Sequence, residues 1–149
     1  MAYKGYFTPK TPKKYKGNPS KIIFRSLWDR KVMQWCDSNP SIIEWSSEEI
    51  SIPYFCPTDR KKHKYFPDFY IKIINNGEIN IQIIEVKPKK QTVPPNNKKR
   101  KTKKRMITEA KMWLKNTAKW KAATEYCKIR NWEFHIITEN HPLLKVYKK

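Results

Sequence analysis

The spacing of hydrophobic and polar residues along this chain predicts two helices and a set of strands. Trp28, Val32 and Cys36 share one face of a helix that begins at Ser26, and Pro40 stops it because proline cannot continue the helical hydrogen bonds. Turn residues separate the β-rich runs that follow. The predicted elements are this helix, extended segments over 42–45 and 49–54, a polar loop or hairpin end over 56–64, a β-hairpin over 65–87, a helix over 106–130 and a strand over 132–137.

The hairpin carries the most specific geometric prediction. Asn76-Gly77 is a favoured two-residue turn, because both positions tolerate positive φ. Counting outward from this turn places Asp68 directly opposite Glu85, with Cβ atoms about 4.5–5.5 Å apart. Lys87 lies two residues beyond Glu85 and therefore points to the same face. One turn thus brings two carboxylates and one ammonium group together.

Two carboxylates at this separation repel each other unless a divalent cation lies between them. Hard oxygen ligands suit Mg²⁺, for which Mn²⁺ would substitute, and we assign the metal to Asp68, Glu85 and Val86. Such a metal polarises a phosphoryl group and lowers the pKa of a bound water, while Lys87 orients the water or balances charge on the phosphate. The alternative is a solvated acid at a strand end beside a surface ion pair.

A third acidic ligand is expected on the first helix. Asp29 is the candidate, although Ser26 and Asp29 also have the spacing of a helix capping box. Residue composition alone does not choose between Asp29 and its rivals, which are Glu44, Glu48 and Glu49.

The charge of the chain indicates a polyanionic partner. Thirty-three Lys and Arg oppose 13 Asp and Glu, for a formal charge of +20, and DNA is favoured over RNA because RNA binding leaves the paired acids without a role. No apolar run approaches the ~20 residues of a membrane span, and no signal sequence is recognisable, so we expect a cytosolic protein.

Cys36, Cys56 and Cys127 are odd in number and widely spaced, which predicts reduced thiols and no thiolate metal site. His63 is expected to contact phosphate at most.

Two segments of the chain are strongly basic, one before the predicted domain and one within it. Residues 1–21 contain six Lys and no acid and are expected to form an extended arm before a single domain over 22–149. Residues 88–105 contain nine Lys or Arg and three prolines, which predicts a long flexible loop. No base-reading motif is visible, so phosphate contacts should dominate. The predicted DNA contacts are Lys89, Lys90, Lys98, Lys99, Arg100, Lys101, Lys119 and Lys121.

Pro67-Asp68 together with Glu85-Val86-Lys87 resembles the motif of the PD-(D/E)XK nuclease superfamily. More narrowly, the chain is similar to the head completion nucleases of large contractile-tailed phages, whose fold is similar to that of transposon-end endonucleases. The resembling stretches run over nearly the whole chain and are residues 13–17, 25–31, 43–49, 65–70, 85–91 and 118–123.

This resemblance implies an α/β fold with a restriction-endonuclease-like core, a mixed sheet flanked by helices in the order α-β-β-β-α-β. It implies a Mg²⁺-dependent DNA endonuclease with Asp68 and Glu85 as metal ligands and Lys87 as the catalytic lysine. The family's helical acid is usually Glu at the position of Asp29, whose shorter side chain favours a water-bridged contact.

The resemblance also implies a biological setting. The enzyme would act late in head completion, trimming or processing the packaged DNA end so that the tail can attach. Its partners would be double-stranded DNA and the phage head or portal proteins, in the host cytoplasm and in association with the virion head. The alternative is a non-catalytic DNA-binding virion protein that stabilises the filled head at the portal.

Overall fold

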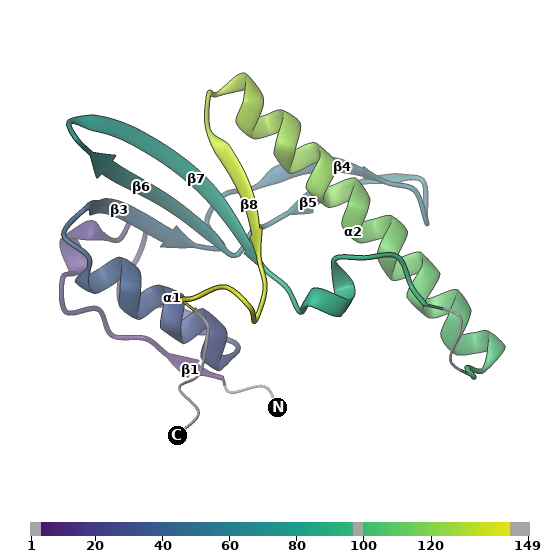
Figure 1. Ribbon diagram of the computed structural model, residues 1–149. Coiled ribbons are helices and arrows are strands. Elements are labelled where there is room, and N and C mark those ends of the chain that lie inside the picture. Colours follow the sequence, from purple (N-terminus) through teal and green to yellow (C-terminus); the bar gives the residue numbers. More distant parts are fainter. Residues whose placement is uncertain (1–3, 97–99, 144–149) are drawn as a thin grey trace.

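A mixed four-stranded sheet with a helix on each face forms the centre of the protein (Figure 1). The computed structural model describes residues 4–96 and 100–143. The strand order is β3-β6-β7-β8, in which β8 is parallel to β7 and the other pairs are antiparallel. In chain order the elements are β1 (Gly5–Tyr6), η1 (Pro12–Lys14), β2 (Ile23–Phe24), α1 (Leu27–Ser38), β3 (Ile42–Ser47), β4 (Ile52–Cys56), β5 (Lys61–Tyr65), β6 (Phe69–Asn75), β7 (Glu78–Val86), η2 (Lys89–Gln91), α2 (Lys103–Ile129) and β8 (Glu133–Ile137).

The elements of this central unit confirm the predicted order of helix, three strands, helix and strand. The first helix, α1, begins where the sequence indicates, because the Ser26 hydroxyl accepts a hydrogen bond from the backbone N–H of Asp29 at 3.1 Å. It ends before Pro40, and the side chains of Val32 and Cys36 are buried.

Alternate residues of the central strands face different helices. Phe69 and Ile71 of β6 pack in one core with α1, whereas Tyr70 packs in another with Ile83 of β7 and Cys127 of α2. Because successive side chains of a strand point to opposite faces, α1 and α2 cover opposite sides of the sheet. The two helices therefore approach the β6–β7 pair from both sides.

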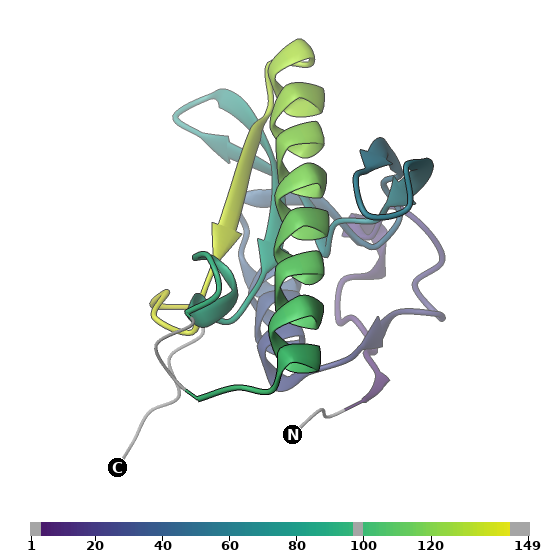
Figure 2. The same ribbon diagram turned by 90° about the vertical axis from the view of Figure 1, so that its right-hand side faces the viewer.

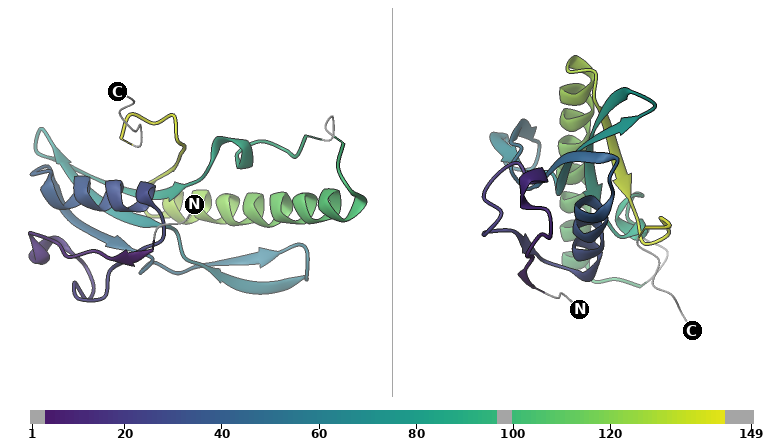
Figure 3. Two further views of the ribbon diagram at one scale, coloured as in Figure 1. Left: turned by 90° about the horizontal axis from the view of Figure 1, so that it is seen from below. Right: turned by 90° about the vertical axis from the view of Figure 1, so that its left-hand side faces the viewer.

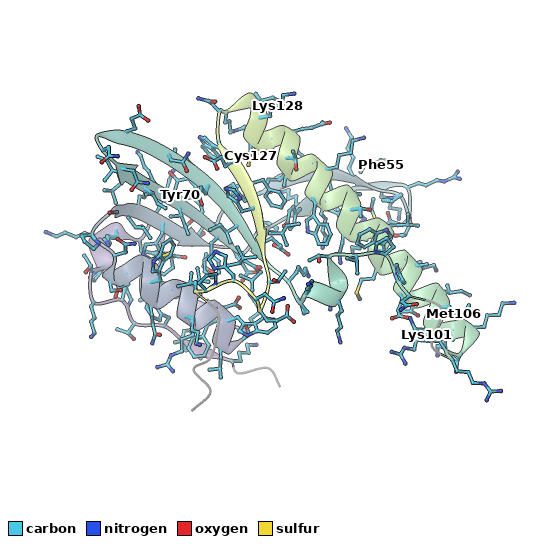
Figure 4. The ribbon with its side chains drawn as sticks, in the orientation of Figure 1. Phe55, Tyr70, Lys101, Met106, Cys127 and Lys128 are labelled. Atoms are coloured by element: carbon cyan, nitrogen blue, oxygen red, sulfur yellow. The ribbon has the colours of Figure 1, made fainter. Side chains whose placement is uncertain are left out.

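The long helix α2 is the crossover that makes β8 parallel to β7. Its C-terminal part lies against the sheet, where Figure 4 labels Cys127, and its N-terminal part, near Met106, extends beyond the sheet edge (Figures 2 and 4). No helix among the described residues combines the length and the apolar character needed to cross a membrane.

A second hairpin, β4–β5, lies between β3 and β6 in the chain and runs alongside α2 (Figure 3). Ile52, Tyr54 and Tyr65 pack against Trp120 and other residues of α2. The prediction of a polar loop or hairpin end over 56–64 is confirmed as a hairpin end, in which residues 57–60 form the turn and residues 61–64 belong to strand β5. The sequence pattern did not indicate this strand, because only one of its residues is buried and its exposed lysines interrupt the alternation of apolar and polar residues.

Two other predicted boundaries also differ. The run over 65–74 is interrupted by residues 66–68, so that Tyr65 ends one hairpin and Phe69 begins a strand of the other. The predicted loop over 88–105 is shorter, because η2 forms within it and α2 begins at Lys103. Thr102 caps this helix by accepting a hydrogen bond from the backbone N–H of Arg105.

The basic N-terminal segment is folded onto the domain from residue 4 onward, which corrects the prediction of an extended arm. The Lys14 ammonium donates to three backbone carbonyls at the end of α1, those of Cys36, Asp37 and Asn39, at 2.7–3.2 Å. A cation at a helix C-terminus is stabilised by the helix dipole. Tyr15 is buried against Trp45, so aromatic packing also holds this segment.

Candidate active site

The β6–β7 hairpin has the predicted register. Asn75 pairs with Glu78 and Phe69 with Ile84, and both turn residues, Asn76 and Gly77, have positive φ of 50° and 79°. Asp68 and Glu85 stand at the next position outward. The Asp68 Oδ2 atom accepts a hydrogen bond from the backbone N–H of Val86 at 2.7 Å, which fixes this carboxylate against β7.

Glu85 is held from two sides. Its side chain is buried, and Oε1 accepts a hydrogen bond from the Tyr65 hydroxyl at 2.7 Å. Its other oxygen, Oε2, lies 3.7 Å from the Lys87 ammonium. The structure therefore brings Asp68, Glu85 and Lys87 together, although their catalytic roles stay predictions.

The two carboxylates are in an environment that disfavours negative charge. Burial raises the pKa of Asp68 well above its usual range, and the charge of Glu85 raises it further. Burial also raises the pKa of Glu85, although the Tyr65 hydrogen bond and the Lys87 charge oppose the rise. Buried carboxylates with raised pKa values in close contact are typical of functional sites.

Asp29 is the additional acid that the structure brings to this pair. Its charge contributes to the raised pKa of Asp68, and burial raises the pKa of Asp29 itself. Besides capping α1, Asp29 uses Oδ2 to accept the backbone N–H of Arg25 at 3.1 Å. Capping and a site role are compatible, because the Ser26 hydroxyl caps α1 through the Asp29 backbone N–H, whereas the Asp29 carboxylate, hydrogen-bonded to Arg25 and Ser26, still acts on Asp68 through its charge.

The three rival acids have other partners. The Glu44 carboxylate accepts a hydrogen bond from Tyr70 at 2.8 Å, and that of Glu49 from Tyr15 at 3.2 Å. The Glu48 carboxylate forms an ion pair with Arg25, and its backbone N–H donates to the Asp68 carbonyl at 3.1 Å. Glu48 therefore adjoins the site through its backbone, whereas its side chain is neutralised by arginine.

Val86 contributes to the site through its backbone. Its side chain packs against the core on the α1 side, and its N–H donates to Asp68. Only a backbone carbonyl of this residue could bind a metal, so its assignment to the metal stays a prediction.

Lys119 reaches the site from α2, whereas Lys121 does not. The Lys119 ammonium lies 5.6 Å from the centre of the Tyr65 ring and 6.0 Å from that of Tyr54. Burial and the nearby charges of Lys115 and Lys87 lower the pKa of Lys119, while the charge of Glu85 raises it. Lys121 is exposed, two residues further along the helix.

Sequence reasoning did not identify Tyr65 as a site residue. No motif marks it, because its role depends on the β4–β5 hairpin ending beside β7. His63 also differs from expectation, since its Nε2 lies 2.6 Å from Asp59 Oδ2 and Cys56 lies close by.

The basic residues near η2 that are predicted to contact DNA differ in their exposure to solvent. Lys89 and Lys90 belong to η2, and Arg100 is exposed. Lys101 is largely covered and pairs with Glu109 at 2.8 Å (its position at the far end of α2 is labelled in Figure 4). Lys98 and Lys99 lie outside the described residues.

The fold and the paired carboxylates define a nuclease domain with a restriction-endonuclease-like core. The chain belongs to the family described as "TnsA-like endonuclease N terminal", whose model matches residues 39–139. It is also similar to the "Head completion nuclease" of Enterobacteria phage T4, with 44% identity over 143 residues that cover 94% of this chain and 93% of that protein. These findings confirm the resemblance that the sequence motifs indicate.

We predict that Asp68→Asn stabilises the metal-free protein at neutral pH by about 0.5–2 kcal/mol. The folded state raises the Asp68 pKa, so the ionised carboxylate destabilises the fold above the usual value of 3.8 and costs nothing once it is protonated. The gain should therefore be present at pH 7 and disappear as the pH falls below 3.8. Urea unfolding in EDTA across this range measures it. Glu125→Gln, on the exposed side of α2, is the control, and a pH-independent gain would contradict the electrostatic cause.

Proposed function

We propose that this protein is a Mg²⁺-dependent DNA endonuclease that processes the packaged DNA end during phage head completion, before tail attachment. The observation that carries the proposal is the pairing of Asp68 with Glu85 beside Lys87 in a domain of an endonuclease family. The similarity to a phage head completion nuclease over nearly the whole chain supports the biological setting.

The residues at the site suit a hard divalent cation. Asp68 and Glu85 provide carboxylate oxygens, and each residue has one oxygen held by a protein donor, Val86 N–H or the Tyr65 hydroxyl. This arrangement orients the second oxygen of each carboxylate. A cation between them would offset the burial that raises both pKa values and the charge of Glu85 that raises the pKa of Asp68 further. When bound, Mg²⁺ or Mn²⁺ would activate a water and polarise the scissile phosphate.

The remaining residues prepare the site for phosphodiester hydrolysis. Lys87, beside Glu85, would hold the attacking water or stabilise negative charge that develops on the phosphate. Tyr65 keeps the Glu85 carboxylate in one orientation through its 2.7 Å hydrogen bond. Lys119 adds positive charge from α2, where a DNA phosphate next to the metal would be attracted to it.

We infer the binding partners of the protein from its net charge and from its similarity to a phage head completion nuclease. A chain with a net charge of +20 would bind double-stranded DNA through phosphate contacts with little sequence preference. We propose that the protein acts in the host cytoplasm in association with the virion head, where head or portal proteins would bring it to the DNA end.

We predict that the wild-type protein cuts linear or circular DNA only when Mg²⁺ or Mn²⁺ is present. Asp68→Ala, Glu85→Gln and Lys87→Ala should each reduce the cleavage rate by at least about 10²-fold, the usual effect of losing one transition-state contact. DNA affinity of the two acid variants should be unchanged or higher, because they remove negative charge. Cleavage assays on both substrates and parallel binding measurements test this, with Glu125→Gln as the control.

The same experiment separates the enzyme from a non-catalytic DNA-binding protein of the head. If the wild-type protein binds both DNA substrates with either metal present but cuts neither, the endonuclease proposal fails. Stable DNA binding by all variants would then favour the protein that stabilises the filled head at the portal.

We predict that Asp29 is the third acid of the site. Asp29→Asn should reduce the cleavage rate by about 10–100-fold and raise the Mg²⁺ concentration needed for half-maximal activity, as expected for a ligand that acts directly or through water. Glu44→Gln should change neither quantity, because Glu44 is bound to Tyr70. Mg²⁺ titrations of the cleavage rate measure both effects, and a larger loss in Glu44→Gln than in Asp29→Asn would reverse the assignment.

We predict different effects for two lysines of α2. Lys119→Ala should lower the cleavage rate by about 10-fold or more, because Lys119 lies beside Tyr65 and Lys87 at the site. Lys121→Ala should reduce only the salt-dependent part of DNA binding, by about one phosphate contact. Single-turnover cleavage and DNA affinity at several salt concentrations distinguish them, and equal cleavage losses would show that Lys119 acts only through general charge.

A further inference from the structure

A second cluster of possible metal ligands lies at the tip of the β4–β5 hairpin, away from the carboxylate pair. Cys56 ends β4, Asp59 lies in the turn and His63 lies within β5. One ligand atom from each of these residues lies within 4.8 Å of the other two. None of the three has a role in the proposed nuclease chemistry.

The hairpin backbone holds these side chains together. The N–H of Arg60, which has a positive φ of 57°, donates to the Cys56 carbonyl at 2.9 Å and closes the turn. The N–H of Lys61 donates to Asp59 Oδ1 at 3.1 Å and orients that carboxylate. Tyr54 pairs with His63 across the strands, and Cys56 follows Tyr54 by two residues, so Cys56 and His63 share a face.

The donor set differs in kind from that of the nuclease site. A thiolate, an imidazole and one carboxylate are the ligands that Zn²⁺ and similar transition metals prefer, whereas Mg²⁺ prefers oxygen alone. Around a tetrahedral ion, ligand atoms are roughly 3.5 Å apart. Small side-chain rotations would bring the three atoms to this spacing, including a widening of the His63–Asp59 contact from 2.6 Å.

A second histidine–carboxylate pair, which has no cysteine beside it, provides a comparison for the Cys56, Asp59 and His63 cluster. His135 Nε2 lies 2.9 Å from Glu133 Oε1 on the exposed face of β8, where no cysteine lies within reach among the described residues. That pair is a surface ion pair alone. At the hairpin tip, Cys56 Sγ lies 3.1 Å from the Thr58 hydroxyl, whose oxygen is a fourth donor atom next to the three ligands.

We propose that Cys56, Asp59 and His63 form a transition-metal site selective for Zn²⁺ over Mg²⁺, with the Thr58 hydroxyl or a water in the fourth position. The site is structural, because it would tie the turn to both strands of the hairpin. The strand β5 leads from His63 to Tyr65, which holds Glu85, so the bound metal would stiffen the support of the carboxylate pair. This proposal stands apart from the nuclease proposal and can fail or succeed without it.

The experiment uses the full chain with Asp68→Ala and Glu85→Ala, so that the carboxylate pair does not bind the probe metals. Co²⁺ should produce an absorption band from thiolate-to-metal charge transfer, and equilibrium dialysis should find one tightly bound Zn²⁺ per chain in the presence of excess Mg²⁺. Zn²⁺ should also raise the melting temperature. The absence of the cobalt band, or of any Zn²⁺ retained against Mg²⁺, would overturn the proposal.

Matched variants test the ligand set in the same background. His63→Asn and Asp59→Asn change exposed side chains and should weaken Zn²⁺ binding at least about 10-fold without unfolding the chain. His135→Asn should leave it unchanged. Cys56→Ser should abolish the cobalt band, and if this buried substitution does not fold, the two exposed variants decide. Equal Zn²⁺ affinity in His63→Asn and His135→Asn would show that the hairpin tip is not the site.

Discussion

The desolvation of two neighbouring carboxylates, the buried Glu85 and the half-buried Asp68, is the constraint on which the candidate site depends. Asp68 and Glu85 are held side by side by the β6–β7 register, and the Val86 N–H keeps Asp68 in place. Burial raises both pKa values, so the metal-free fold carries an electrostatic cost that a divalent cation would relieve. A loss of stability of this kind is common at functional sites.

Elements on both faces of the sheet bring further side chains close to Asp68 and Glu85. α1 approaches from one side with Asp29, and α2 covers the other side with Lys119 above Tyr65. The β4–β5 hairpin is a separate two-stranded unit packed on α2, and its last residue, Tyr65, donates a hydrogen bond to Glu85. Rigidity of this hairpin therefore bears on the orientation of Glu85, which connects the proposed transition-metal site with the carboxylates.

The chain belongs to a TnsA-like endonuclease family and is similar to a phage head completion nuclease. A fold does not determine a biological role by itself. Proteins with this fold can share an arrangement in which two acids and a lysine face a phosphate and still differ in biological role. The net charge of +20 favours attraction to DNA, whatever determines where the chain acts.

Local sequence signals determined much of this protein. The Asn76-Gly77 turn set the hairpin register and hence the meeting of Asp68 and Glu85, and Ser26 with Pro40 set the limits of α1, because turns and caps depend on neighbouring residues. Only the tertiary structure decided which distant residues join the site. Asp29, Lys119 and Tyr65 reach it through the packing of α1, α2 and the β4–β5 hairpin on the sheet. For the same reason the sequence did not indicate that His63 lies beside Cys56 and Asp59 at the end of a hairpin rich in exposed lysines. Nor did it indicate that Lys14, in the segment expected to be an extended arm, caps the C-terminal end of α1.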